Sequence, residues 1–413
     1  MTDRRFDTPQ SAREIAPAVT NAYPKVLEPA PRGTALLRWA MYASAFTASW
    51  TAAAVGGFNV VDYALGAAFV VLCVVALAQR RFLRVRAWMW AALGGAALTS
   101  AWNTIVSDEP FDATMMLRIF LTTVCVGMLV LSSLEWIGAA FLFRLLRVWV
   151  GGVVVNSLAA IAVSTGTVSF SGFLTQSTGE RLSGLASHPN SLAFSITMAL
   201  APCVFLVLAG PFRFFWVFCF AMMAWAGVLS DSRSLLLVGI PVLLLSLIVA
   251  VRRSHLRSWA IPILIVGGIA TWWTLPNVIG SSRLAGDEGA LSDAGRTVIN
   301  ENAMRIFLDN PLTGSSFANQ AGVSVILTVL SAGGLIFAAG YYLFIFGPVH
   351  TLWRARSVTA SPYGLLCIVA LLGFGLLNPV FMERATYWPI VIAFAICRHS
   401  IESRAADRPV QQT

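Results

Sequence analysis

Charged side chains are scarce in this chain. Asp, Glu, Lys and Arg make up 11% of its 413 residues, whereas soluble proteins average about 25%. Hydrophobic residues reach 57%, and a soluble fold of this length could not bury that much apolar surface. The composition therefore excludes a soluble globular protein and predicts an integral membrane protein.

Lysine, histidine and metal-ligand clusters are also rare. All but one of the 28 basic residues are arginine, and most of the +9 net charge lies where membrane topology requires it, so nucleic-acid binding is not expected. Three of the four histidines, His255, His350 and His399, fall on the predicted cytoplasmic side, so neither a metal nor another cofactor is expected. The six cysteines lie within or at the ends of apolar stretches and are expected to be small core residues.

Twelve apolar stretches approach the length of about 20 residues that crosses a membrane. Because a lipid-embedded backbone must satisfy its own hydrogen bonds, each is predicted to be a helix. The expected fold is all-α, a polytopic integral membrane protein with about 12 transmembrane helices in one domain, residues 34–398. The predicted spans are 34–54, 60–78, 87–106, 115–133, 146–166, 189–209, 213–230, 233–251, 259–277, 321–346, 362–378 and 384–398.

The basic residues divide between the two sides of this predicted bundle. Twenty-one of the 28 lie in the terminal tails and alternate loops, which predicts that both termini face the cytoplasm across an inner or plasma membrane. Residues 1–33 are polar and rich in proline and are expected to be a disordered cytoplasmic tail, and residues 399–413 a second tail. Six arginines lie on the opposite side, which predicts an extracytoplasmic site for an anionic group. They are Arg181, Arg233, Arg283, Arg296, Arg305 and Arg384.

Two predicted outer loops, residues 167–188 and 278–320, are longer than a connection requires. In the second loop, Ser292 or Asp293 can cap a helix that the Asn-Pro pair at 310–311 would end. Apolar residues at helical spacing give this helix one hydrophobic face, formed by Ile299, Ala303, Ile306 and Phe307. Such an amphipathic helix can lie on the outer leaflet, roof a site, or do both.

Four short motifs stand on the predicted outer side. They are Arg-x-x-Gly-x-x-x-His-Pro-Asn over residues 181–190, Ser-Asp-Ser-Arg-Ser over 230–234, Gly-Arg at 295–296 with Asn-Pro-Leu-Thr-Gly at 310–314, and Glu-Arg at 383–384. Taken in this order, they resemble the O-antigen ligase and polysaccharide polymerase family of bacterial envelope glycosyltransferases over roughly residues 140–345. The resemblance implies transfer of a glycan from an undecaprenyl-diphosphate carrier to a glycan or glycolipid acceptor at the outer membrane face, with membrane lipid as a further partner.

The resemblance implies a metal-independent, inverting glycosyltransferase of the ligase or polymerase type. An acceptor sugar hydroxyl would attack the anomeric carbon and displace the carrier diphosphate. Since a guanidinium can bind two phosphate oxygens at once, Arg181, Arg233 and Arg296 are expected to hold the diphosphate, with Arg384 or Arg118 as helpers. For any single outer arginine the alternative is contact with a lipid headgroup or an ion pair with a nearby acid.

Helix geometry separates some of these arginines. Arg296 and Arg305 are nine residues apart, which places them on opposite faces of an ideal helix, so only Arg296 is expected to face the site. Arg118 lies inside the fourth predicted span, where a lipid-facing arginine costs about 3 kcal/mol, so an inward position is expected. Asp62 is its candidate partner, either in the site or in a purely structural ion pair.

The resemblance leaves the proton acceptor unassigned. The ligase branch of the family usually has a histidine just before the tenth span, and the matching position here is Val323, which cannot accept a proton. The candidate catalytic residues on the outer side are Asp231, Glu383 and His188. His188 has a competing structural role, because it directly precedes the proline that starts the sixth predicted span.

Two alternatives to a working transferase stay open. A transporter or flippase of lipid-linked glycans would place polar and charged groups near the middle of the membrane, whereas here they crowd the outer third. A catalytically degenerate family member is the other, since position 323 lacks the histidine. A hydrolase is not expected, because Ser232 and Ser234 have no outer histidine–carboxylate pair at a recognisable spacing.

Overall fold

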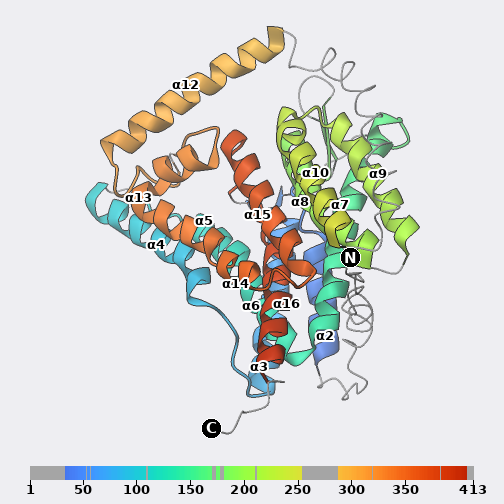
Figure 1. Ribbon diagram of the computed structural model, residues 1–413. Helices are drawn as coiled ribbons and strands as arrows, with labels where there is room; N and C mark the ends of the chain where they lie inside the picture. The colour runs from blue at the N-terminus through green and yellow to red at the C-terminus, as the bar shows by residue number, and fades with distance from the viewer. Residues whose placement is uncertain are drawn as a thin grey trace, which may run out of the picture.

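The computed structural model describes residues 33–52, 54–55, 57–107, 110–169, 174–176, 181–209, 212–253, 287–318, 320–381 and 383–406 (Figure 1). Within these ranges the chain is mostly helical, as predicted. Its strands form two short antiparallel pairs, β1 (Ala54–Val55) with β2 (Phe58–Asn59) and β3 (Thr175–Gln176) with β4 (Leu182–Gly184). The predicted ninth span, Arg283, residues 1–32 and residues 407–413 lie outside the described residues.

The helices follow one another with short connections. In chain order they are α2 (Thr34–Phe46), α3 (Val60–Ala78), α4 (Ala87–Ser107), α5 (Ala113–Ile119), α6 (Val126–Trp136), α7 (Ala139–Ser164), α8 (Pro189–Ala209), α9 (Arg213–Leu229), α10 (Ile240–Arg253), α12 (Asp287–Asp309), α13 (Val325–Phe346), α14 (Val349–Arg354), α15 (Ala360–Leu377) and α16 (Tyr387–Ala406). Two π-helical segments, η1 (Phe120–Cys125) and η2 (Leu235–Gly239), join α5 to α6 and precede α10. Seven helical stretches in the described part are long and apolar enough to cross a membrane, against the twelve spans predicted.

The first predicted span, residues 34–54, is too long. Helix α2 ends at Phe46, and the chain then turns so that the Trp50 indole N–H donates to the Gly152 carbonyl (3.2 Å) and the Ala52 N–H to the Leu185 carbonyl (2.9 Å). Hydrogen bonds to distant segments therefore replace the last turns of the expected helix. The last predicted span, 384–398, also shifts, since α16 begins at Tyr387 and continues to Ala406.

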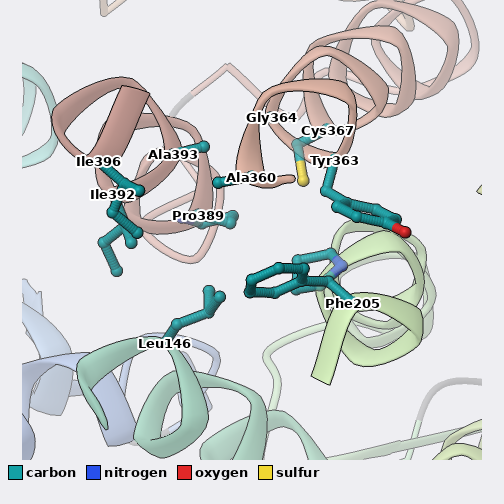
Figure 2. Close-up of a pocket in the computed structure, with 11 residues that line it drawn as sticks. Leu146, Phe205, Ala360, Tyr363, Gly364, Cys367, Pro389, Ile392, Ala393 and Ile396 are labelled. Atoms are coloured by element: carbon teal, nitrogen blue, oxygen red, sulfur yellow. The ribbon is translucent and has the colours of Figure 1, made fainter. Parts of the chain in front are cut away.

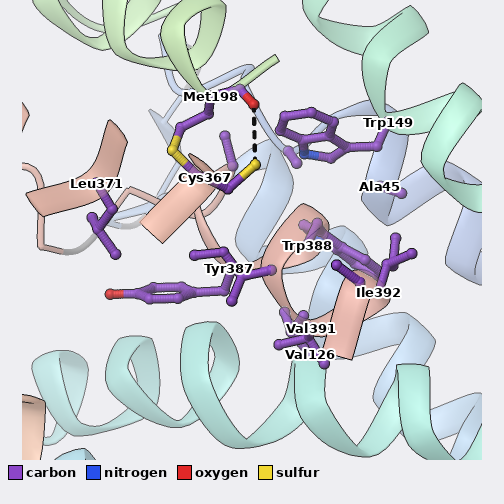
Figure 3. Packing of buried hydrophobic residues seen from close by; sticks show 14 of the residues in the cluster. Ala45, Val126, Trp149, Met198, Cys367, Leu371, Tyr387, Trp388, Val391 and Ile392 are labelled. Atoms are coloured by element: carbon purple, nitrogen blue, oxygen red, sulfur yellow. Dashed lines mark hydrogen bonds between the residues drawn. The ribbon is translucent and has the colours of Figure 1, made fainter. Parts of the chain in front are cut away.

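The centre of the bundle is formed around α8, α15 and α16 (Figure 1). In the membrane-spanning part of α8, 89% of the residues are buried, compared with 28% over η2 and α10. Helix α10 therefore presents most of its surface outward. Large side chains from several helices meet in this core, among them Trp149 of α7 and Trp388 of α16 (Figure 3). The thiol of Cys367 donates to the Met198 carbonyl at 3.6 Å. All six cysteines are free and five are buried, as expected of core residues.

Helix α12 lies across one end of the bundle and packs against α13 (Figure 1). It begins at Asp287, so the predicted caps Ser292 and Asp293 lie inside the helix instead of starting it. The helix ends at Asp309, immediately before the Asn-Pro pair, as predicted.

The expected hydrophobic face of α12 is only partly present. Ala303 is buried, and Ile306 and Phe307 are partly buried. Ile299 is 47% exposed, and on the remaining surface Val298 is 65% exposed. Apolar side chains thus occur on both sides of α12, and the amphipathic pattern is weaker than the sequence spacing indicated.

Candidate functional site

The first two predicted motifs meet at one end of the bundle. Residues 181–190 lead into α8, and residues 230–234 join α9 to η2. The partly buried Arg181 guanidinium connects them, because its Nε donates to the Ser230 carbonyl (3.1 Å) and its Nη2 to Oδ1 of Asn190 (3.0 Å). Segments about 50 residues apart in the chain are therefore held together by one of the predicted diphosphate ligands.

A chain of amide and hydroxyl groups extends from Arg181. Asn190 Oδ1 also accepts from the Ser232 hydroxyl (3.2 Å), and Asn190 Nδ2 donates to Oδ1 of Asn378 (2.8 Å). Asn378 Nδ2 in turn donates to the Ser234 hydroxyl oxygen (2.6 Å). Ser232, Ser234 and Asn378 are buried. Asn378 is not among the residues predicted from the sequence, although an Asn-Pro pair at the end of an apolar span is a signal that could have identified it.

Arg296 reaches the same region from α12. Its Nη1 donates to the carbonyl of Leu377, the last residue of α15, at 3.5 Å. Arg305 lies on the exposed surface of α12 and donates to Oδ1 of Asn302 at 2.8 Å. The nine-residue spacing therefore separates the two arginines as expected, with Arg296 directed toward the bundle.

The turn between α9 and η2 holds Asp231 and Arg233. Asp231 has a positive φ of 42°, a left-handed conformation that aspartate adopts more readily than most residues. The Asp231 N–H donates to the Val228 carbonyl at 3.0 Å, which closes the turn. Arg233 lies between Ser232 and Ser234, whose side chains join the amide chain, so its backbone belongs to the cluster.

His188 caps the start of α8. Its Nδ1 accepts the backbone N–H of Asn190 (3.0 Å), and its carbonyl accepts the N–H groups of Ser191 and Leu192 (2.9 and 3.2 Å). Burial lowers the pKa of His188, and the positive charges of Arg181 and Arg296 lower it further. The neutral ring thus carries its proton on Nε2, and accepting another would create a cation beside two arginines. The structural role that competed with catalysis at this position is the one its contacts favour.

Glu383 lies next to the amide chain. Its Oε1 accepts the hydroxyl of Ser191, the neighbour of Asn190, at 2.6 Å. Burial raises the pKa of Glu383, while the hydrogen bond from Ser191 and the charge of Arg384 act in the opposite direction. A carboxylate with a raised pKa is a better proton acceptor than an exposed one, so Glu383 is the strongest of the three candidates.

Arg384 and Asp62 form a buried ion pair. Arg384 Nε and Nη2 donate to Oδ1 and Oδ2 of Asp62 at 2.8 and 2.9 Å. Asp62 Oδ2 also accepts the backbone N–H of Asn59 (3.0 Å), in the first turn of α3. The Asp62 carboxylate neutralises the buried Arg384 guanidinium, so Arg384 is better explained as a structural residue than as a helper in the site.

Arg118 does not pair with Asp62, so that prediction is wrong. Its Nη2 donates to the Gly57 carbonyl, and its guanidinium lies over the ring of Phe58, 5.8 Å from the centroid. Both oxygens of Asp62 are taken by Arg384, which leaves Arg118 to the backbone of the β1–β2 hairpin. Its described contacts do not join those of Arg181, Asn190 and Asn378.

Two further contacts hold the 181–188 segment in place. Asn156 of α7 is fully buried; its Oδ1 accepts the Leu185 N–H (2.7 Å) and its Nδ2 donates to the Ser49 carbonyl (3.0 Å). Gly184 has a φ of +59°, and a Cβ there would lie 2.5 Å from the Asn156 carbonyl oxygen. The glycine of the first motif is therefore required for close packing of the arginine-bearing segment on α7.

The Asn-Pro-Leu-Thr-Gly motif has a structural role. Helix α13 is interrupted at Gly334, whose φ of 59° and ψ of −158° are not helical. The N–H groups of Leu335 and Ile336, after the break, donate to the carbonyls of Pro311 and Leu312 (2.9 and 3.1 Å). The segment after α12 thus supplies the acceptors that the broken helix lacks. Val323, at the position of the expected histidine, donates its backbone N–H to Oδ1 of Asn300 on α12 (3.0 Å).

A small apolar pocket with a cavity volume of about 20 Å³ lies elsewhere, between α7, α8, α15 and α16 (Figure 2). Its walls include Leu146, Phe205, Tyr363 and Ile392. Tyr363 lies in the first half of α15, and at about 1.5 Å per residue it is roughly 21 Å along the helix from its last residue, Leu377. The pocket is therefore separate from the hydrogen-bonded chain of Arg181, Asn190 and Asn378, and its walls are almost entirely apolar. Among the described residues, no group of three or more His, Cys, Asp or Glu could hold a metal ion.

No protein-family model matches the chain, and no curated protein matches it. The residues of the site are therefore the only guide to its chemistry. It combines Arg181, Arg296 and the Ser230–Ser234 turn with two asparagines and a carboxylate of raised pKa. Such a set can bind a polyanion and accept a proton from a neighbouring hydroxyl group.

Proposed function

We propose that the protein is an extracytoplasmic glycosyltransferase of envelope polysaccharide assembly, similar to the O-antigen ligases and polymerases. It transfers a glycan from an undecaprenyl-diphosphate carrier to an acceptor sugar. The observation that carries the proposal is the meeting of Arg181, Arg296 and the turn containing Arg233 at one end of the helix bundle. Several guanidiniums drawn from separate segments suit a ligand with several phosphate oxygens.

In the proposed reaction these arginines bind the diphosphate of the donor. An acceptor hydroxyl attacks the anomeric carbon, the bond from that carbon to the diphosphate oxygen breaks, and the configuration inverts. Negative charge grows on the departing diphosphate, so the guanidiniums stabilise the transition state more than the bound donor. Glu383 takes the proton of the hydroxyl, with Ser191 orienting the carboxylate through its 2.6 Å hydrogen bond.

The proposed orientation follows the distribution of basic residues. Both termini face the cytoplasm, twelve helices cross the membrane, and the end that carries Arg181 faces outward. The buried charged side chains that the structure describes include Asp62, Glu383 and Arg384, which lie in the first turn of α3 or just before α16. A transporter would be expected to place charged groups near the middle of its helices, so this placement favours the transferase.

The decisive experiment compares arginine-to-lysine variants in a glycan-transfer assay. Lysine keeps the charge and loses the planar fork, so Arg181→Lys, Arg233→Lys and Arg296→Lys should each impair diphosphate recognition. If each arginine contributes a charge-assisted hydrogen bond of about 1.5–3 kcal/mol, transfer should fall roughly 10- to 150-fold per site. The matched control is Arg305→Lys on the exposed surface of α12, which should transfer at the rate of the unmodified protein.

The assay needs the lipid-linked glycans of cells with and without the gene. A donor that accumulates in cells lacking the gene, and disappears when the gene is restored, identifies the substrate for the variants. Equal transfer by all four variants at matched expression would show that these arginines do not bind the diphosphate. No change in lipid-linked glycans on loss of the gene would instead support the degenerate alternative, in which position 323 has lost its catalytic group.

A further inference from the structure

Asn378 is the point at which the three arginine-bearing segments of the site meet. Its Oδ1 accepts from Asn190, which in turn accepts from Arg181, and its Nδ2 donates to Ser234 beside Arg233. The preceding residue, Leu377, accepts from Arg296 through its carbonyl. Two consecutive residues at the end of α15 therefore contact all three segments.

The order of donors and acceptors in this chain is fixed by its first member. A guanidinium can only donate, so Asn190 must present Oδ1 to Arg181 and Nδ2 to Asn378. Asn378 must then present Oδ1 to Asn190, which leaves its Nδ2 to donate to Ser234. A residue at 378 that is to keep this arrangement needs an acceptor and a donor on one short planar side chain, as asparagine has.

The backbone holds Asn378 in position for these contacts. It is the C-terminal cap of α15, with extended dihedral angles of −148° and 150°. The proline at 379 enforces that conformation, because it disfavours helical geometry in the residue before it. The side chain is 2% exposed, so its two hydrogen bonds are made without competition from solvent.

We propose that Asn378 is a positioning residue that sets the spacing of Arg181, Arg233 and Arg296 for binding a diphosphate. The inference rests on the proposed function, since it assumes that these arginines share one polyanionic ligand. Asn378 itself makes no contact with the reacting atoms. It acts through the orientation of Asn190 and of the turn at 230–234.

Binding of inorganic pyrophosphate to the purified full-length protein, measured by calorimetry, tests this role. Asn378→Ala removes both hydrogen bonds and should weaken binding about tenfold or more, since the arginines lose their common spacing. Asn378→Asp keeps the shape and both hydrogen bonds, because the Ser234 hydroxyl can turn to donate to it. It should nevertheless weaken pyrophosphate binding, because the new carboxylate attracts guanidiniums away from the pyrophosphate.

The pH dependence separates these outcomes. At each pH the affinity for pyrophosphate is compared with that of the unmodified protein. As the pH falls and its carboxyl is protonated, Asn378→Asp should recover affinity, whereas Asn378→Ala should not. Asn103→Ala is the matched control, because Asn103 is also buried but donates to the Thr313 and Ser315 carbonyls, outside the arginine contacts. It should lower thermal stability and leave pyrophosphate affinity unchanged.

Two results would overturn the inference, and they differ in what they imply for the function. If the unmodified protein binds pyrophosphate and both Asn378 variants bind it equally well while folded, Asn378 does not position the arginines, and the proposed function survives. If the unmodified protein does not bind pyrophosphate, the polyanion site fails and the role of Asn378 fails with it.

Discussion

Arg384 and Arg181 show two ways of placing an arginine at the end of a helix bundle. Arg384 is buried and meets the carboxylate of Asp62 with both prongs of its guanidinium. Arg181 is partly buried and donates to a backbone carbonyl and an amide oxygen, which are neutral groups. The first contact cancels a charge and joins two distant segments. The second ties a guanidinium to two neutral acceptors, one from each of two separate segments of the chain.

The largest effect is expected from breaking the neutralised pair. Asp62→Asn keeps the shape and the acceptor for the Asn59 N–H but leaves Arg384 buried without a counter-charge. Loss of one partner of a buried ion pair costs about 3–5 kcal/mol, so the thermal unfolding temperature in detergent should fall clearly. Combining Asp62→Asn with Arg384→Gln should recover much of that loss. Glu135→Gln, which breaks the exposed pair with Arg84, is the control and should change little.

A smaller, pH-dependent effect is expected at Glu383. Because burial raises its pKa, the folded state favours the neutral carboxyl. This contribution to stability is complete below the ordinary glutamate pKa and is lost as the pH rises through the raised value. The unfolding temperature of Glu383→Gln should therefore increase relative to the unmodified protein as the pH is raised. Parallel curves for the two proteins across that range would contradict the raised pKa.

The smallest effect concerns His188, whose contacts indicate a helix cap. His188→Ala removes the acceptor for the Asn190 N–H and should cost about 1 kcal/mol of unfolding free energy. His188→Asn supplies another capping oxygen and should restore both stability and pyrophosphate binding. If His188→Asn folds normally and yet loses glycan transfer at least as completely as Glu383→Gln, His188 and not Glu383 would be the proton acceptor.

Much of the helical framework could be predicted because its signals are local. The predicted spans 60–78 and 189–209 coincide with α3 and α8. Each is a largely apolar stretch with a clear start, which is an asparagine at the N-cap of α3 and a proline at the first position of α8. The interruption of α13 was missed, since the glycine pair at 333–334 resembles ordinary close helix packing until the carbonyls from 311–312 are known to lie there.

The site contacts were harder to predict because they join residues far apart in the chain. Asp62 and Arg384 are separated by 322 positions, and Asn190 and Asn378 by 188. One sequence gives the charges and their side of the membrane, yet it does not say which carboxylate meets which arginine. A shared side of the membrane does not identify the partner of a charge. Asp62 pairs with Arg384, and Arg118, its predicted partner, donates to the Gly57 carbonyl instead.

The π-helical segment η2 sets the register between the Ser230–Ser234 turn and α10. A π-turn holds one residue more than an α-turn, so η2 corresponds to a single inserted residue directly after Ser234. Deleting one residue between positions 235 and 239 would restore a regular helix and rotate the Ser230–Ser234 turn by about 100° relative to α10. Ser234 would then no longer face Asn378. A variant that lacks one residue of η2 should therefore lose the serine–asparagine contact.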